Sequence, residues 1–520
     1  MLILIPALLL FLTALVITVL QIMRPNFRFT WLIAVAGALL AWISVLLWQS
    51  NLPLSFNFLP WKPANLFFES PAFSAGTLIW PYALSLATLA ISILLTASVN
   101  ETFPGAFAWA GSLTLCGFGL LAITSANPLT LALAWAALDF TELIIMLRSV
   151  NGSAANERIV VSFSIRAAGI ALLIWVSVVT AASGKGFDFS TLPSQAGLYL
   201  LIAAGLRLGV LPLHLPYSSE SGLRRNFGTT LRLVTAASSL VVLAHIPASS
   251  LASPFTPFLL VLAALAGIYG GWMWLRAPDE LTGRPFWMIG LASLAVAAAL
   301  LGNPVGSVAW GIALILVGSV LFLYSVQQVW LNRVLLIGAF GLSALPFSLT
   351  ASGWQGAISD YWYILPFLLV AQALLMTGFI RNALRPSLHA SLESQPVWTR
   401  GIYPAGIGLL LLVQLVLGLW GWDGALTVGA WEAGLVASLL GLGLLWALPR
   451  VPALNPVPAH WVGPSVTPWL DRLYQNLWTL YRWLARLGEA VSNILEGDSG
   501  IMWTLLFLVL FILLITQGKP

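Results

Sequence analysis

The sequence predicts an all-α polytopic membrane protein with about sixteen transmembrane helices, and three observations predict it. Hydrophobic residues make up 60% of the 520 residues, charged residues only 8%, and the mean hydropathy is +0.95. A soluble domain carries about 25% charged residues, so this chain lacks the polar surface that a water-facing fold needs. Basic residues also gather in alternate connections between apolar segments, as expected for helices that cross a bilayer in alternating directions.

The composition argues against several other functions. The single cysteine, Cys116, excludes an intrachain disulfide and a cysteine-based metal site. The four histidines show no ligand spacing, and we find no Gly-rich phosphate loop, so we expect neither a metal nor a cofactor. The net charge of +5 and the pI near 9.5 fit cationic loops at a membrane face better than nucleic-acid binding.

A transmembrane helix needs about 20 apolar residues, and the chain offers about sixteen such segments. The first segment lacks a basic start and a cleavage site, so we expect it to be retained as a helix. In order, the predicted spans are 2–23, 30–48, 78–99, 105–125, 128–147, 159–181, 196–213, 229–247, 256–275, 286–302, 306–326, 333–350, 361–380, 402–421, 426–447 and 500–517.

The positions of the basic residues predict the orientation of these spans. The even-numbered connections and the C-terminus hold only Lys62, Lys185 and Lys519. The odd-numbered connections hold Arg24, Arg28, Arg148, Arg158, Arg224, Arg225, Arg276, Arg284, Arg333, Arg381, Arg385, Arg400, Arg450, Arg472, Arg482 and Arg486. Because basic loops stay in the cytoplasm, both termini should lie on the outer side of a bacterial-type cytoplasmic (inner) membrane.

Five ionisable residues lie inside predicted spans in the first half of the chain. Asp139 and Glu142 lie three residues apart and therefore share one face of the fifth helix. Arg166, Arg207 and Arg232 lie inside later spans. Such groups are costly in lipid, so we expect both carboxylates inside the bundle, paired with arginines or water. The sequence leaves two interpretations open: a structural ion pair that sets helix register, or a proton or ion relay.

Two predicted helices are interrupted by proline at matching positions. The stretch from 205 to 216 combines Arg207, Pro212 and His214 in an apolar run, and 345–349 repeats its Leu-Pro-X pattern around Pro346. Proline frees a backbone carbonyl, which neighbours or water must satisfy. We therefore predict two inverted five-helix repeats, formed by helices 4–8 and 9–13, with helices 7 and 12 broken. The second copy has Ser348 where the first has His214.

The predicted organisation follows from these segments. Residues 1–104 hold helices 1–3, residues 105–250 the first repeat, residues 251–381 a charge-poor second repeat, and residues 382–450 helices 14 and 15. Residues 451–499 form a Pro-rich segment followed by an amphipathic helix, which lies in the membrane interface or along a partner. Residues 500–520 form the terminal transmembrane helix.

Several motifs resemble the antiporter-like, proton-pumping subunits of respiratory complex I, which are related to Mrp cation antiporters and membrane-bound hydrogenases. Arg207 … Pro212-Leu213-His214 resembles the family's Lys … Pro-Phe-His signature. The run from Asn127 to Trp135 resembles the family's Asn … Trp-Glu pattern. Residues 231–246 resemble the family's eighth helix around Arg232, and residues 345–352 resemble its Leu-Pro-Pro … Ser pattern.

The chain also departs from the family pattern. Ala136 stands where the family has a glutamate, and Asp139, one turn later, is a possible substitute. Arg207 replaces the family's lysine, and an arginine keeps its proton at neutral pH. The position of the family's twelfth-helix lysine is occupied in this chain by Gly353 or Trp354. We interpret the chain as a divergent member whose second half has lost its titratable groups.

The resemblance implies a membrane-arm subunit of an NADH:quinone oxidoreductase-like or antiporter assembly, without a catalytic centre of its own. It would contribute to redox-coupled proton or sodium translocation and would contact other membrane-arm subunits and lipid. Candidate residues for the proton or ion path are Asp139, Glu142, Arg207, His214 and Arg232. His214 is the titratable one near neutral pH. Two alternatives remain: a non-pumping scaffold subunit of the same assembly, and a stand-alone secondary transporter.

Overall fold

The computed structural model describes residues 1–451 except 26, 28, 60–69, 100–104, 150–152, 185, 216–224, 327, 357–360, 386–391 and 423–429, and beyond them only 472, 475, 476, 479, 482, 483 and 486. The chain divides into two compact units, Met1–Gly463 and Pro464–Pro520. The predicted terminal span, 500–517, and all but those seven positions of the amphipathic helix lie outside the described residues. The fold below is that of the first unit.

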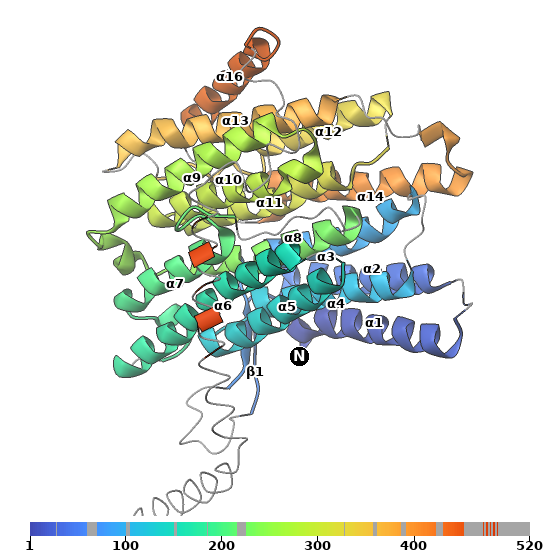
Figure 1. The fold of residues 1–520 in the computed structure, drawn as a ribbon, viewed down its shortest axis with the longest axis horizontal. Coiled ribbons are helices and arrows are strands. Elements are labelled where there is room, and N and C mark those ends of the chain that lie inside the picture. Colours follow the sequence, from blue (N-terminus) through green and yellow to red (C-terminus); the bar gives the residue numbers. More distant parts are fainter. Residues whose placement is uncertain are drawn as a thin grey trace, which may run out of the picture. The chain divides into compact units, whose positions relative to one another are not determined.

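Within the described residues the first unit is a bundle of fifteen α-helices, most of which run side by side (Figure 1). Twelve helical segments are long and apolar enough to cross a membrane, and three more are apolar but shorter. The prediction of an all-α polytopic membrane protein is therefore confirmed. The helices are α1 (Ile5–Met23), α2 (Thr30–Leu46), α3 (Trp80–Thr96), α4 (Ala106–Ile123), α5 (Pro128–Ser149), α6 (Ser153–Ala182), α7 (Ser194–Leu208), α8 (Arg225–Leu240), α9 (Thr256–Arg276), α10 (Glu280–Leu300), α11 (Pro304–Leu323), α12 (Val329–Gly341), α13 (Leu365–Leu384), α14 (Val397–Val416) and α16 (Trp431–Ala447).

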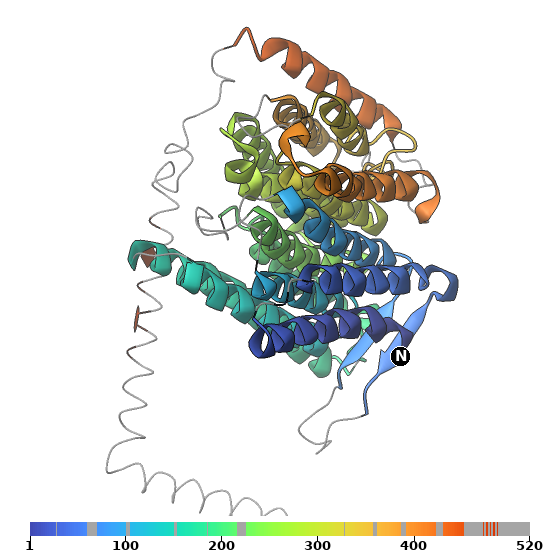
Figure 2. The ribbon, with the colours of Figure 1, turned by 90° about the vertical axis from the view of Figure 1, so that its right-hand side faces the viewer.

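A short β-hairpin between α2 and α3 was not predicted. Strand β1 (Leu54–Asn57) pairs antiparallel with β2 (Ala72–Ala75), and both contact the 3-10 turn at the N-terminus (Figure 2). The connection after α4 extends this pairing, because Ser74 donates its N–H to the Thr124 carbonyl and Ala126 donates its N–H to the Ala72 carbonyl. Four residues per strand are too few for their alternation to stand out in an apolar sequence.

The centre of the bundle is formed by α3, α8, α10 and α11. In α10 and α11, 94% of the spanning segment is buried, compared with 33% in α1 and α2. Small residues allow close helix contacts there. At Gly270 of α9, a β-carbon would lie 2.6 Å from the backbone nitrogen of Gly290 in α10, so only glycine fits at that crossing.

The two five-helix repeats, α4–α8 and α9–α13, pack in the same order. In each repeat, consecutive helices contact one another and the first helix contacts the last: α4 packs against α8, and α9 packs against α13. Five is an odd number of helices, so the second repeat begins at the opposite end of the bundle and is inverted relative to the first. Arg284 links the two repeats. The sequence predicts this residue in a connection, but it lies buried near the start of α10. Its guanidinium donates a hydrogen bond to Oγ1 of Thr229 in α8, 3.0 Å away.

The fourth helix of each repeat, α7 or α12, is broken, and it ends earlier than predicted. Helix α7 ends at Leu208, where Gly209 adopts a left-handed φ of 77° and its N–H caps the carbonyls of Gly205 and Leu206. The predicted span 196–213 thus ends in turns that contain Pro212. Because this left-handed geometry favours glycine, Gly209 and not Pro212 ends the helix.

Helix α12 ends at Gly341, so the predicted span 333–350 also continues as turns, which contain Pro346. Side chains satisfy the backbone groups that the break frees. Thr350 Oγ1 donates to the Gly341 carbonyl and accepts from the N–H of Ala344, and Gln372 donates to the Leu342 carbonyl.

Candidate functional site

One face of α5 carries the residues around which the site is built. Trp135, Asp139 and Glu142 follow one another at four- and three-residue steps and therefore point to the same side of the helix. All three are buried. This face is directed toward α6, α7 and α8, each of which contributes one arginine to it.

Arg207, at the end of α7, forms a two-pronged ion pair with Asp139. Its Nη1 lies 2.5 Å from Oδ2 of the carboxylate and its Nη2 lies 2.8 Å from Oδ1. The guanidinium also stacks over the Trp135 ring, 4.2 Å from its centroid, and Nε donates to Ser239 Oγ at 3.3 Å. Paired, stacked and hydrogen-bonded, Arg207 is held in one orientation.

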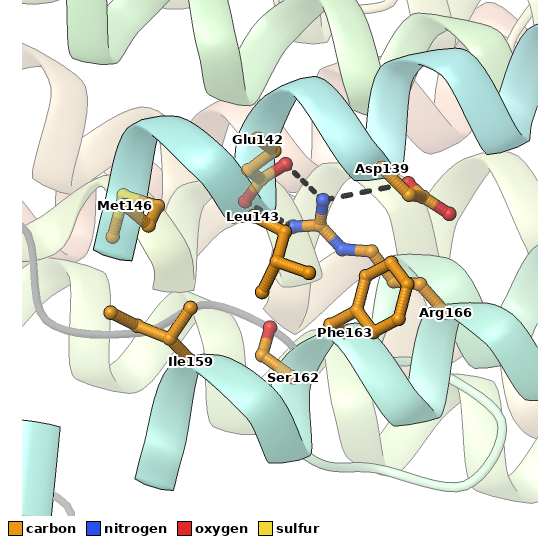
Figure 3. Close-up of a pocket in the computed structure, with 8 residues that line it drawn as sticks. All are labelled: Asp139, Glu142, Leu143, Met146, Ile159, Ser162, Phe163 and Arg166. Atoms are coloured by element: carbon orange, nitrogen blue, oxygen red, sulfur yellow. Dashed lines mark hydrogen bonds and ion pairs between the residues drawn. The ribbon is translucent and has the colours of Figure 1, made fainter. Parts of the chain in front are cut away.

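Arg166 of α6 joins the two carboxylates of α5. Its Nη1 contacts Glu142 Oε2 and lies 3.8 Å from Asp139 Oδ1, and its Nη2 lies 2.8 Å from Glu142 Oε1 (Figure 3). Its backbone carbonyl also accepts a hydrogen bond from Arg207 Nη1 at 3.2 Å. Arg166 is therefore the central connection between the two acidic groups.

Arg232 of α8 completes the series. Its Nη1 lies 2.6 Å from Glu142 Oε1, and its side chain is fully buried. The charges then alternate in the order Arg207, Asp139, Arg166, Glu142 and Arg232, which we call the five-residue ion network. Its side chains are at most 7% exposed.

The network is built to hold charge inside the bilayer. An isolated ion at this depth is costly, whereas each carboxylate here lies against two guanidinium groups. Arginines keep their protons, so a change in the network would be a change of pairing or of carboxylate protonation. Asp139 and Glu142 both contact Arg166, so a change at one carboxylate alters the field at the other.

His214 lies outside the hydrogen bonds and ion pairs just described. It is buried, and its Nδ1 lies 2.7 Å from the Pro212 carbonyl oxygen. Its Nε2 is buried and has no hydrogen-bond partner among the described residues. The structure thus brings together four of the five candidate path residues and places His214 directly after the turns that follow α7.

The candidate path residues predicted from the sequence do not include Arg166, Trp135 or Ser239. Arg166 stands out in the sequence only as an ionisable residue inside a span. A usable signal was present, because two carboxylates on one helix face call for several cationic partners and the neighbouring spans offered three. Trp135 and Ser239 carried no such signal, since their roles depend on where Arg207 lies.

Neutral groups surround the break after α12, in the second repeat. Trp354 donates to Gln372 Oε1 at 2.9 Å, and Gln372 donates to the Leu342 carbonyl at 2.8 Å. Ser348, at the position that corresponds to His214, is buried. In place of the charged series of the first repeat, the described residues around the end of α12 offer amide, indole and hydroxyl groups.

Comparison with known proteins shows the fold. No family model and no curated protein matches the sequence. A chain of the Mrp complex from Dietzia sp. DQ12-45-1b superposes with a TM-score of 0.70 at 15% identity, over 99% of this chain and 63% of that one. A chain of the archaeal membrane-bound sulfane sulfur reductase gives a TM-score of 0.64 at 14% identity, over 98% and 99%. A chain of respiratory complex I from Thermus thermophilus gives 0.60 at 18% identity, over 85% and 99%.

This protein therefore shares the fold of membrane chains from an Mrp complex and two respiratory complexes, and the predicted resemblance is confirmed at the level of the fold. It spans less than two thirds of the length of the Mrp chain.

Proposed function

We propose that this protein is a membrane subunit of a multi-subunit, ion-translocating complex and takes part in coupled translocation of protons or sodium ions. The observation that carries the proposal is the five-residue ion network across α5–α8. Buried ionisable residues beside a broken helix are the usual elements of an ion path in a membrane protein. The fold supports the same assignment, because its structural neighbours are chains of multi-subunit membrane complexes.

In the proposed mechanism the network transmits a change of charge and does not carry protons through its arginines. Protonation of Asp139 weakens its attraction for Arg207 and leaves Arg166 more strongly paired with Glu142. That shift changes the field at Arg232, on the far side of Glu142. A conformational change in a partner subunit drives this shift. The proposal also includes the orientation that the basic connections predict, with both termini on the outer side of the membrane.

The test compares a single with a paired variant in the assembled complex. Asp139→Asn/Arg207→Gln removes both charges without leaving either one unpaired, whereas Arg207→Ala leaves the aspartate with only the more distant Arg166. We expect the paired variant to assemble and to lose ion translocation, measured in proteoliposomes with a pH- or sodium-sensitive dye. Translocation at the wild-type rate in this variant would refute the relay.

A second function is favoured by the neutral break in α12. With Gln372 and Trp354 beside it, the described part of the second repeat, α9–α13, holds no charged series comparable to that of the first repeat. A subunit that only supports the architecture of the complex needs no titratable groups. That alternative predicts normal translocation in the paired variant, provided that the complex assembles.

A further inference from the structure

A small cavity lies beside the ion network, between α5 and α6 (Figure 3). Each helix contributes four residues at steps of three, one and three, so the cavity follows one face of each helix. Its lining residues are Asp139, Glu142, Leu143 and Met146 of α5, and Ile159, Ser162, Phe163 and Arg166 of α6.

The lining is polar at one end and apolar at the other. Asp139, Glu142 and Arg166 line the inner end, and the Ser162 hydroxyl lies next along the same face of α6. Met146 and Ile159 line the opposite end, and both are buried. An enclosed space that touches three ionised groups and a hydroxyl is a hydrated one, whereas a purely apolar void stays dry.

The size of the cavity limits what it holds. It has room for about one water molecule, which is too little for an organic solute. A water there has carboxylate oxygens as acceptors and guanidinium N–H groups as donors, which gives it the two to four polar partners that an ordered buried water needs.

The apolar end lies close to the ends of both helices. Met146 is three residues from the end of α5 at Ser149, and Ile159 is six residues from the start of α6 at Ser153. At about 1.5 Å per residue, these positions lie one to two turns from the helix ends. Arg148, which is exposed, marks this end as the basic side of the bundle. Leu143 and Phe163, which are half-buried, close the cavity on the side that faces the surface of the bundle.

We propose that this cavity is a water site through which the Glu142–Arg166 pair exchanges water with the basic side of the membrane, along the α5–α6 contact and past Met146 and Ile159. The inference deepens the proposed function and rests on it, because the water is the proton donor and acceptor that the carboxylates require. The water site itself is testable without any measurement of ion transport.

X-ray radiolytic footprinting of the whole complex tests it. Hydroxyl radicals form from water where that water resides, and a methionine beside it is oxidised to the sulfoxide. Met146 is 1% exposed, and Met288 in α10 is 0% exposed and does not line the cavity, so Met288 is the matched control. We expect Met146 to be oxidised several-fold faster than Met288. Equal, slow oxidation of the two methionines would overturn the proposal.

A variant that fills the cavity makes the test specific. Ser162→Leu places an apolar side chain where the water lies, so Met146 oxidation should fall to the rate of Met288, while that of Met288 stays unchanged. If Ser162→Leu does not assemble, the smaller Ser162→Val is measured in its place. An unchanged Met146 rate in the assembled variant contradicts the water site. Because the readout is oxidation, this result is independent of whether the complex translocates ions.

Discussion

Arg207 and Asp139 form a two-pronged ion pair, with N–O distances of 2.5 and 2.8 Å, in which both side chains are only 1% exposed. Arg207 is the penultimate residue of α7, so its positive charge lies at the carbonyl end of a helix, where the helix dipole favours a cation. The pair therefore joins the middle of α5 to the point at which α7 breaks.

Removal of Arg207 should destabilise the protein strongly. Arg207→Ala leaves Asp139 as a buried carboxylate with only the more distant Arg166, and loss of one partner of such a pair costs about 3–5 kcal/mol. Arg207→Lys keeps the charge but not the two-pronged geometry, so it should fall between wild type and alanine. The measurement is the free energy of unfolding in mixed detergent micelles.

The control for this prediction is Arg148→Ala. Arg148 is exposed at the end of α5, so its replacement should change stability by less than about 0.5 kcal/mol. If Arg207→Ala is no more destabilising than this control, the ion pair does not stabilise the fold.

Glu142 should be coupled energetically to Arg232. Glu142→Gln removes the carboxylate that separates Arg166 from Arg232 and leaves two guanidinium groups without it. Adding Arg232→Met to that variant should restore part of the lost stability, with a coupling energy of about 0.5–3 kcal/mol in a double-mutant cycle. Strict additivity of the two single effects would show that the contact carries no energy.

Gly169 should be intolerant of any side chain. A β-carbon there would lie 2.7 Å from Cγ and 3.0 Å from Cδ of Arg207, and 3.3 Å from the backbone oxygen of Ala203. Gly169→Ala must push Arg207 away from Asp139, and such overpacking costs about 1–3 kcal/mol.

Gly408→Ala in α14 is the matched comparison, because its β-carbon would meet nothing within 4 Å. Alanine is favoured over glycine in a helix by about 1 kcal/mol, so this variant should be neutral or more stable. Equal thermal melting of Gly169→Ala and Gly408→Ala would contradict the close packing of Arg207 on α6.

The hydroxyl of Tyr403 should stabilise the connection that follows α11. It accepts hydrogen bonds from the backbone N–H groups of Ser325 and Val326, at 2.6 and 3.2 Å. Tyr403→Phe leaves both donors without this acceptor, at a cost of about 1–3 kcal/mol. Tyr363, which is 45% exposed, is the control, and its replacement by Phe should leave the melting temperature unchanged.

The sequence by itself determined the class of the protein and most of its helices. In lipid, an apolar segment of about 20 residues satisfies the hydrogen bonds of its own backbone by forming a helix. Hydropathy therefore locates such helices without tertiary information. The same logic marked Asp139, Glu142, Arg207 and Arg232, because charges inside such segments are rare and must face the interior. Pro212 and Pro346 lie in the turns that follow α7 and α12, and each helix ends several residues before its proline.

Only the tertiary structure decided which charges meet. Asp139 and Arg207 are 68 residues apart, and helix periodicity gives the face of each residue but not the neighbour that the face meets. The central position of Arg166, the stacking of Trp135 on Arg207 and the cavity between α5 and α6 all depend on how four helices pack. The β-hairpin also escaped prediction, since its pairing with the end of α4 is non-local.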